Sequence, residues 1–543
     1  VEAPVSSLAD SIGVDYRSLF ASLGKATVSG LVAFGTGHPA AFARTIKDVM
    51  GAFTAFDTLQ SSHDLPEAPG ELAWLLIHES LLHAVIELVE EHGDRFRAAY
   101  GGEVDNLPDA DDMEQHLSDT LDLRFVKTDL RLNKSFLDRP ANLPILEPIQ
   151  RDVAAWFQEL QVPEKEARSI ADRLPHYFQS AILEEARRRP EYVELRDAVE
   201  GLFSDAEARV YGWKQYRAFL QKQVDESVLK GDAVSLRQVY VPPRAYVVDA
   251  YDEDAARLGA SGTRRVLPLR ETLLDWLSDT NKNDAIRVIS GGPGSGKSSF
   301  TKMFAAHLAD AEQLPVIRIP LHLLRNPSGD LKESVLQFVG DRDSLRDVEP
   351  FTEDRLLLIF DGLDELSMRG KMGVEAARQF VQEVRTAIRG WNYNSLQVFI
   401  LLSGREVAVQ ASTTAFGQEA IMHLIPYVAE QGDQIEYDDP DHLLSEDQRD
   451  TWWRQYGDVS GAESYDGMPE ELRGPEDTER DSLRDITAQP LLNYLVARIH
   501  EDSEGAITAD SSLNEIYHQL LDGVYNRDYD FGRHPGAEVV KSK

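Results

Sequence analysis

A glycine-rich octapeptide carries the clearest chemistry in the sequence. It reads GGPGSGKS and matches the pattern G-x-x-x-x-G-K-[ST]. Glycines let the backbone wrap closely around phosphates, and successive N–H groups can point at the anion. We expect Lys297 to reach the β- and γ-phosphates of a nucleotide and the Ser298 hydroxyl to ligate Mg²⁺. The predicted phosphate site comprises Gly291, Gly292, Pro293, Gly294, Ser295, Gly296, Lys297, Ser298 and Ser299.

A second chemical group stands at the end of the aliphatic run RLLLIFDGLDEL. Asp361 closes the run, and Asp364 and Glu365 follow it. A carboxylate at the end of a buried strand can meet Mg²⁺ directly or through its water shell. Either Asp364 or Glu365 could polarise an attacking water. Acids that merely begin the next helix are the alternative, but beside a phosphate loop we favour the catalytic interpretation.

A third run, QVFILLSGREV, ends an apolar segment with Arg405. Ligands of open α/β sheets bind at the carboxyl edge of the strands. A guanidinium there can touch the γ-phosphate and report its presence. A surface arginine in a strand-to-helix loop is the alternative. Because the first two motifs accompany it, we favour the sensor role.

The stretches between these motifs alternate between strand-like and helical patterns. Aliphatic or β-branched runs occur at 286–289, 316–319, 356–360 and 398–402, with helical segments such as SSFTKMFAAHLA between them. This alternation predicts βαβ units and a parallel sheet. Runs that are apolar at nearly every position are typical of strands buried on both faces. We therefore predict an α/β nucleotide-binding core over residues 283–430.

Helical periodicity dominates the chain on either side of this core. Apolar residues recur at helical spacing in segments such as EPIQRDVAAWFQEL and ITAQPLLNYLVARIH. The predicted organisation adds four regions to the core: a helical N-terminal region that is a candidate effector or interaction module (1–135), a helical bundle (136–230), a linker (231–282) and helical subdomains after the core (431–543).

Composition excludes several classes of function. The 543 residues carry a formal net charge of −37, which argues against general binding to nucleic acid. Cysteine is absent, so disulfides, thiolate catalysis and cysteine-bound zinc are excluded. No apolar run reaches the roughly 18 to 20 residues of a membrane span. We expect a cytoplasmic chain without a membrane partner, and its first residue, Val1, fits a fragment of a longer protein.

Together these motifs resemble the NACHT class of STAND nucleoside triphosphatases. The resemblance lies in the D-G-x-D-E strand end, in the succession of phosphate loop, DGLDEL and LLSGR, and in QPLLNYL. Pro490 of that last stretch matches the proline that the family places against the adenine. The resemblance covers about Val239 to Tyr525 and implies a NACHT/AAA+-like P-loop NTPase with a parallel sheet that binds ATP or ADP with Mg²⁺. The segment SGREV departs from the family's Ser-Arg-Pro run.

The resemblance implies a switch with weak ATPase activity. ADP would hold the module closed, and a trigger with ATP would open it, so that open subunits form a homo-oligomer. Converting a 1:99 equilibrium to 99:1 takes about 5.5 kcal/mol of differential binding. The family's setting implies bacterial antiphage immunity, with a phage protein as a candidate trigger. Two alternatives stay open: a nucleotide-binding scaffold with little hydrolysis, and an ordinary ATPase or kinase acting on a small substrate.

Overall fold

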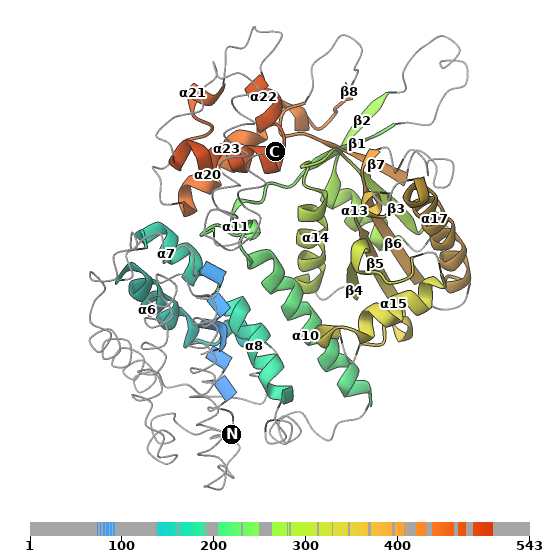
Figure 1. Cartoon of the computed structure of the whole chain (residues 1–543), viewed down its shortest axis with the longest axis horizontal. Coiled ribbons are helices and arrows are strands. Elements are labelled where there is room, and N and C mark those ends of the chain that lie inside the picture. Colours follow the sequence, from blue (N-terminus) through green and yellow to red (C-terminus); the bar gives the residue numbers. More distant parts are fainter. Residues whose placement is uncertain are drawn as a thin grey trace, which may run out of the picture. The chain divides into compact units, whose positions relative to one another are not determined.

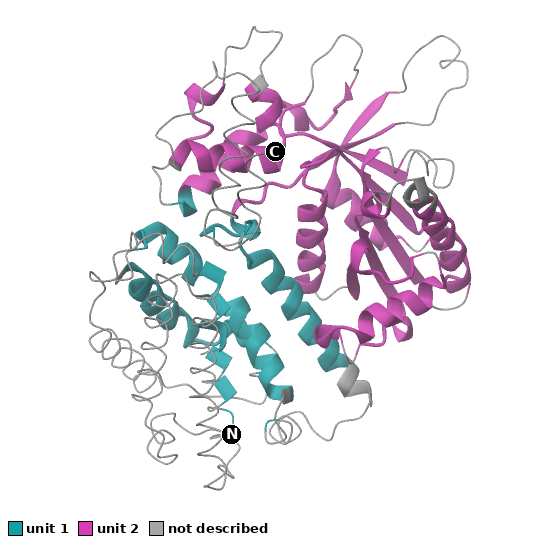
Figure 2. Cartoon of the chain, viewed as in Figure 1, with its two compact units in different colours: residues 1–238, 458–461 teal, residues 239–457, 462–543 magenta. Residues whose placement is uncertain are grey.

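The computed structural model of the chain divides into two compact units. One comprises Val1–Gln238 with Asp458–Gly461, and the other comprises Val239–Gly457 with Ala462–Lys543 (Figure 2). Most of the predicted N-terminal region 1–135 lies outside the described residues, as does 503–543. The structure describes these ranges, several with short gaps: 73–92, 137–159, 162–188, 192, 205–229, 232–248, 263–279, 281–311, 314–367, 371–393, 397–409, 420–429, 437–460, 465–473 and 482–502.

The first unit is built of helices where it is described. Helical residues between 73 and 92 precede the turn η2 and a series of α-helices (Figure 1). Phe157, Leu174 and Phe178 are completely buried among them, as the helical periodicity predicts. The elements are η2 (Pro140–Asn142), α6 (Leu146–Glu159), α7 (Glu164–Ala171), α8 (Leu174–Arg188), α10 (Asp205–Asp225) and α11 (Leu236–Val239).

A buried polar cluster lies inside this helical unit. The Nδ1 atom of His92 is 2.7 Å from the carbonyl oxygen of Leu88, so Nδ1 must carry the proton. The Nε2 atom is then left as an acceptor, and it lies 3.1 Å from Nη1 of the nearly buried Arg173. Burial lowers the pKa of His92 to about 4, and the charge of Arg173 acts in the same direction. The imidazole is therefore neutral at neutral pH.

The described part of the second unit contains an eight-stranded sheet in the order β4-β5-β6-β3-β7-β1-β2-β8. Neighbouring strands from β4 to β7 are parallel, β1 is antiparallel to β7 and β2, and β2 is parallel to β8. A mixed α/β fold with a mostly parallel sheet is thereby confirmed. The strands are β1 (Arg244–Val248), β2 (Arg264–Pro268), β3 (Ile286–Ser290), β4 (Val316–Pro320), β5 (Arg355–Asp361), β6 (Gln397–Gly404), β7 (Ile421–Ile425) and β8 (Tyr437–Asp438).

The four predicted apolar runs all form strands, namely β3, β4, β5 and β6. All residues of β6 are buried, as are Leu356 to Phe360 of β5. Figure 1 shows α14 and α17 on opposite sides of these strands, which explains the continuous apolar runs. The helices of this part are α13 (Leu269–Ser278), α14 (Lys297–Ala311), α15 (Leu331–Gly340), α16 (Leu363–Ser367) and α17 (Lys371–Trp391).

The stretch predicted as a linker, 231–282, contributes to the sheet. It contains β1, β2 and α13. Their burial alternates or is partial, and β1 joins the sheet at the side of β7 that faces away from β3. Short strands of this kind carry a much weaker sequence signal than the continuous runs of the central strands.

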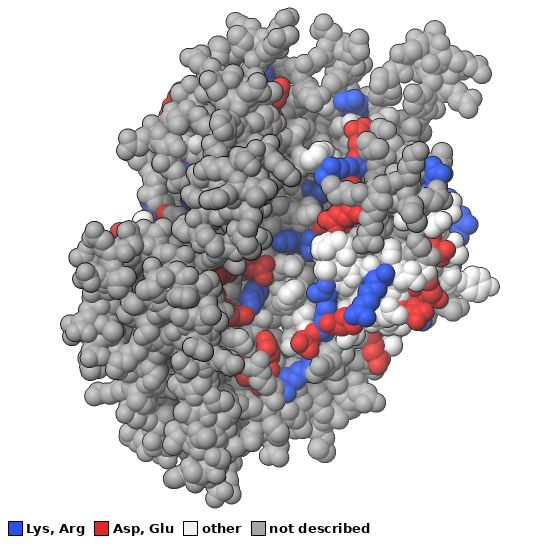
Figure 3. Space-filling model, viewed as in Figure 1, with Lys and Arg blue, Asp and Glu red and all other residues white. Residues whose placement is uncertain are grey.

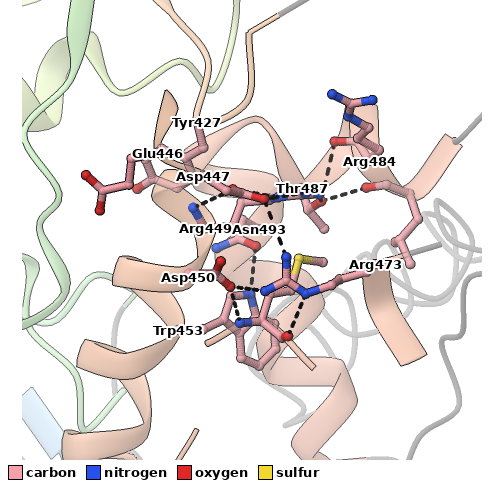
Figure 4. Close-up of polar contacts among 12 residues, drawn as sticks. Tyr427, Glu446, Asp447, Arg449, Asp450, Trp453, Arg473, Arg484, Thr487 and Asn493 are labelled. Atoms are coloured by element: carbon pink, nitrogen blue, oxygen red, sulfur yellow. Dashed lines mark hydrogen bonds and ion pairs between the residues drawn. The ribbon is translucent and has the colours of Figure 1, made fainter. Parts of the chain in front are cut away.

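Helices resume after the sheet, and the described ones lie between Gln448 and Asp502. Trp453 is completely buried, and its indole N–H donates to Oδ1 of Asn493 at 3.1 Å. Arg449 donates to Asp447 and to the Thr487 hydroxyl, at 2.7 and 3.0 Å (Figure 4). These contacts tie the start of α20 to the helices that follow. The helices are α20 (Gln448–Val459), α21 (Glu470–Arg473), α22 (Ser482–Thr487) and α23 (Pro490–Asp502).

Arg244 of β1 connects this helical subdomain to the sheet. Its guanidinium donates to the carbonyl oxygens of Tyr427, Leu443 and Glu446, at 2.6, 2.6 and 2.8 Å. The Tyr427 N–H in turn donates to the carbonyl oxygen of Ala488, at 2.9 Å, just before α23. Several bonds to one buried cation hold the subdomain at a fixed place beside the strands.

Candidate nucleotide site

The glycine-rich octapeptide forms the connection between β3 and α14. β3 ends at Ser290 and α14 begins at Lys297, so the predicted strand–loop–helix order is present. Gly294 and Gly296 have φ values of +74° and +88°, a region in which only glycine is comfortable. Such a loop turns its N–H groups towards a common centre at the positive end of a helix, which suits an anion.

The side chain of Lys297 folds back onto the start of the glycine-rich loop. Its Nζ atom donates to the carbonyl oxygens of Gly291 and Gly292, both at 2.8 Å. Burial lowers the pKa of Lys297, the carboxylates of Asp364 and Asp361 oppose this, and the charge of Arg405 reinforces it. The charges of Asp361, Asp364 and Arg405 therefore all act on the ammonium group of Lys297.

Asp361 at the end of β5 meets Ser298 directly. Its Oδ1 atom accepts hydrogen bonds from the hydroxyl of Ser298, at 3.2 Å, and from that of Ser403. Its Oδ2 atom pairs with the guanidinium of Arg318, and the Asp361 side chain is only 5% exposed. The two residues predicted to hold a metal are therefore adjacent.

The donor atoms of this pair fit Mg²⁺. A hydroxyl and a single carboxylate are hard oxygen ligands, and Mg²⁺ in nucleotide sites takes few protein ligands and completes its shell with phosphate and water. Among the described residues there is no cluster of three or more histidine, cysteine, aspartate or glutamate side chains.

Asp364 and Glu365 have different partners, although the sequence treats them alike. Asp364 accepts from the backbone N–H of Arg405 at 3.2 Å and pairs with its Nε at 2.9 Å. The Oε2 atom of Glu365 lies 2.7 Å from Nδ1 of His322, and both side chains are about half exposed. Asp364 therefore anchors Arg405, whereas Glu365 contacts His322 and stays partly exposed to solvent.

Pro490 lies against the phosphate loop. A Cβ atom built on Gly296 would be 3.6 Å from Cγ of Pro490, and one built on Gly294 would be 3.6 Å from Cβ of Leu491. The Leu491 N–H also faces the Gly294 carbonyl oxygen at 3.4 Å. The start of α23 is thereby in contact with the predicted phosphate site.

Residues 8–234 match the family model described as NNH3, NACHT N-terminal Helical domain 3. This match supports a NACHT-type protein. It covers residues 8–135 of the first predicted region and all of 136–230, and it lies outside the phosphate loop. The comparison with curated proteins found no match.

The sequence did not predict three residues that contact the acids of this site, namely Arg318, His322 and Ser403. Arg318 and His322 come from β4 and the turn after it, and Ser403 comes from β6. One signal was present: VIRIP places an arginine inside a strand flanked by apolar residues. A charge buried in a sheet is costly unless it is paired, so such an arginine indicates a buried acid nearby.

The described surface adds two observations. On the face shown in Figure 3, the coloured Lys, Arg, Asp and Glu side chains are interspersed and do not separate into fields of one sign. Within the described ranges, none of the helices combines the length and the apolar character that a membrane crossing requires.

Proposed function

We propose that the chain is the nucleotide-dependent switch of a STAND-type signalling protein. It binds ATP or ADP with Mg²⁺ at the phosphate loop, hydrolyses ATP slowly and associates with copies of itself in the ATP state. The observation that carries this proposal is the convergence of Lys297, Ser298, Asp361, Asp364 and Arg405 at the carboxyl ends of neighbouring parallel strands. The NACHT-type match over residues 8–234 adds independent support.

Nucleotide binding would change the contacts of the Lys297 side chain and leave the sheet and helices in place. Lys297 would exchange the carbonyl oxygens of Gly291 and Gly292 for the oxygens of the β- and γ-phosphates. Ser298 and the Oδ1 side of Asp361 would hold Mg²⁺, which when bound neutralises phosphate charge. Pro490, already against the loop, would contact the base.

Hydrolysis needs a base and a group that reads the γ-phosphate. We assign the first role to Glu365, because its carboxylate is half exposed and could take the proton of an attacking water. His322 holds that carboxylate at 2.7 Å. We assign the second role to Arg405, which Asp364 orients through two contacts. A guanidinium so fixed can bond the γ-phosphate without reorganising.

The difference between ATP and ADP would drive the switch. Only a ligand with different affinities for two states can shift their populations, and the γ-phosphate is the part that differs. About 5.5 kcal/mol of such difference converts a closed population into an open one. The antiphage setting, the phage trigger, the cytoplasmic location and the homo-oligomer belong to this proposal and rest on the NACHT-type match.

Light scattering after size exclusion tests the proposal. Wild type, Lys297→Ala and Lys332→Ala are each run with ADP and with a non-hydrolysable ATP analogue plus Mg²⁺. Lys332 is an exposed lysine on α15 and serves as the charge-matched control. We expect a larger species only with the analogue, in wild type and Lys332→Ala. In Lys297→Ala, nucleotide binding weakens at least about tenfold, because a charged hydrogen bond is worth about 1.5–3 kcal/mol.

Each other result has a definite meaning. If wild type binds nucleotide but keeps the same oligomeric state with ADP and with the ATP analogue, the switch is contradicted and the nucleotide-binding scaffold is favoured. A wild type that binds no nucleotide sinks the whole proposal. Steady turnover that rises with a small molecule and ignores protein concentration favours the ordinary ATPase or kinase.

A further inference from the structure

A buried arginine stands behind the proposed metal site. Arg318 lies in the middle of β4, opposite Ile359 of β5, and its side chain is only 6% exposed. A guanidinium does not lose its proton in proteins, so this positive charge is permanent. Its burial must be compensated by partners of opposite charge and by hydrogen bonds.

Two partners of Arg318 belong to the proposed metal site or to the helix beside it. Its Nη2 atom pairs with Oδ2 of Asp361, and its Nε donates to the Thr301 hydroxyl at 3.1 Å. That hydroxyl donates in turn to the carbonyl oxygen of Ser298, at 3.0 Å. One cation thus joins β4, the end of β5 and the first turn of α14. It also leaves Oδ1 of Asp361 as the oxygen that faces Ser298.

We propose that Arg318 is the resident counter-ion of Asp361 and makes Mg²⁺ binding conditional on a bound nucleotide. The inference deepens the proposed function and rests on it. Asp361 is the carboxylate that would ligate the metal, and its charge is already balanced by Arg318. A bare Mg²⁺ ion, which gives up its water reluctantly, gains little from a neutralised carboxylate beside two cations, Arg318 and Lys297.

A nucleotide changes this balance. Its phosphates bring several negative charges and further oxygen ligands, so the ion can enter as a complex with them. Arg318 stays on Oδ2 and keeps the carboxylate turned towards Ser298. Because coupling between two ligands is reciprocal, the metal also strengthens nucleotide binding by the same factor. Arg318 is therefore a positioning residue, and it touches neither the metal nor the phosphates.

Binding of Mn²⁺, followed by electron paramagnetic resonance as a probe for Mg²⁺, tests the inference on the full chain. Wild type, Arg318→Gln and Arg318→Lys are titrated without nucleotide and with ADP. Glutamine removes the charge and keeps an N–H donor, whereas lysine keeps the charge. Without nucleotide, we expect Arg318→Gln to bind Mn²⁺ about tenfold or more tightly than wild type, the scale on which groups behind the ligands tune metal affinity. Arg318→Lys should behave as wild type, and adding Asp361→Asn to Arg318→Gln should abolish the gain.

Two results overturn the inference. One is equal Mn²⁺ affinity of wild type and Arg318→Gln without nucleotide. The other is a wild type that binds Mn²⁺ as tightly without ADP as with it, and this measurement holds even where Arg318→Gln fails to fold. Binding of a fluorescent ATP derivative to wild type in the presence of Mg²⁺ is measured separately. Its absence refutes the proposed function, whereas the Mn²⁺ results above refute only the role of Arg318.

Discussion

The buried imidazole of His92 predicts that the helical unit loses stability as the pH falls below 6.5. Burial lowers the pKa of His92 from the ordinary 6.5 to about 4. In the unfolded chain the ring takes up a proton near pH 6.5, but in the folded chain it resists protonation until about pH 4. Between these values the unfolded state binds the extra proton, so acid favours unfolding. At about 1.4 kcal/mol for each pKa unit, the full effect is about 3 kcal/mol, of which about 2 kcal/mol is reached by pH 5.

His83, which precedes His92 in the same unit, provides a control of opposite sign. The hydrogen bond of its Nδ1 to Glu185, at 3.1 Å, raises the pKa of His83 and outweighs the effect of burial. Its stabilising contribution is present below pH 6.5 and is lost as the pH rises through the raised value. The two histidines therefore tilt the pH dependence of stability in opposite directions.

Hydrogen exchange of the full chain measures both effects. Opening free energies of peptides from α6 and α8 are compared at pH 7.5 and pH 5, after correction for intrinsic exchange rates, in wild type, His92→Gln and His83→Gln. Wild type should lose about 2 kcal/mol more than His92→Gln between these pH values. His83→Gln should keep that loss or enlarge it. Parallel changes in wild type and His92→Gln would refute the assignment of a neutral, buried imidazole.

Two further substitutions probe the second unit. In Gly362→Ala, the new Cβ would lie 2.8 Å from Cδ of Glu365 at a φ of +93°, so we expect ATP turnover to fall at least about tenfold while a fluorescent ATP derivative still binds. Gly340→Ala, with no atom within 4 Å of the new Cβ, is its control, and equal turnover in the two variants would contradict the prediction. In Trp453→Ala, loss of a completely buried indole should cost about 3–5 kcal/mol in a denaturation experiment. Trp453→Phe, which keeps an aromatic ring but removes the bond to Asn493 and part of the indole, should cost less, about 1–3 kcal/mol, and equal losses would contradict this packing.

The central sheet could be predicted because its strands are buried on both faces. The run 398–402 lies within β6, and the structure extends the strand to Gln397–Gly404. Continuous apolar runs are easy to recognise in a sequence, because burial on both faces leaves no room for polar positions. β1 and β2 lack that signal: RRVLP begins with two arginines, and only its middle residues are buried. The place of β1 was decided by antiparallel pairing with a distant strand, β7, and β2 in turn pairs with β1; the local sequence encodes neither pairing.

The site shows a similar division. Phosphate chemistry restricts which residue types can follow a strand, so Lys297, Ser298 and Asp361 could be predicted from the motifs, and the structure places Ser298 beside Asp361. The distinct partners of Asp364 and Glu365 could not, because they depend on which strands lie beside β5. Strand order places β6 on one side of β5 and β4 on the other. Arg405 follows β6 and pairs with Asp364, whereas His322 follows β4 and contacts Glu365.

The net charge of the chain does not describe the charge at the proposed site, which depends on the side chains that the strand order brings together. The chain has a net charge of −37, yet the proposed site balances its own charges in pairs. Asp361 is matched by Arg318 and Asp364 by Arg405, and Lys297 is held by backbone carbonyls. Under the proposed function, a nucleotide that enters this site adds negative charge that Lys297 and Arg405 would meet. Under the same proposal, an ion that arrives with the phosphates would meet the remaining charge, so that binding of the nucleotide and of Mg²⁺ would depend on each other.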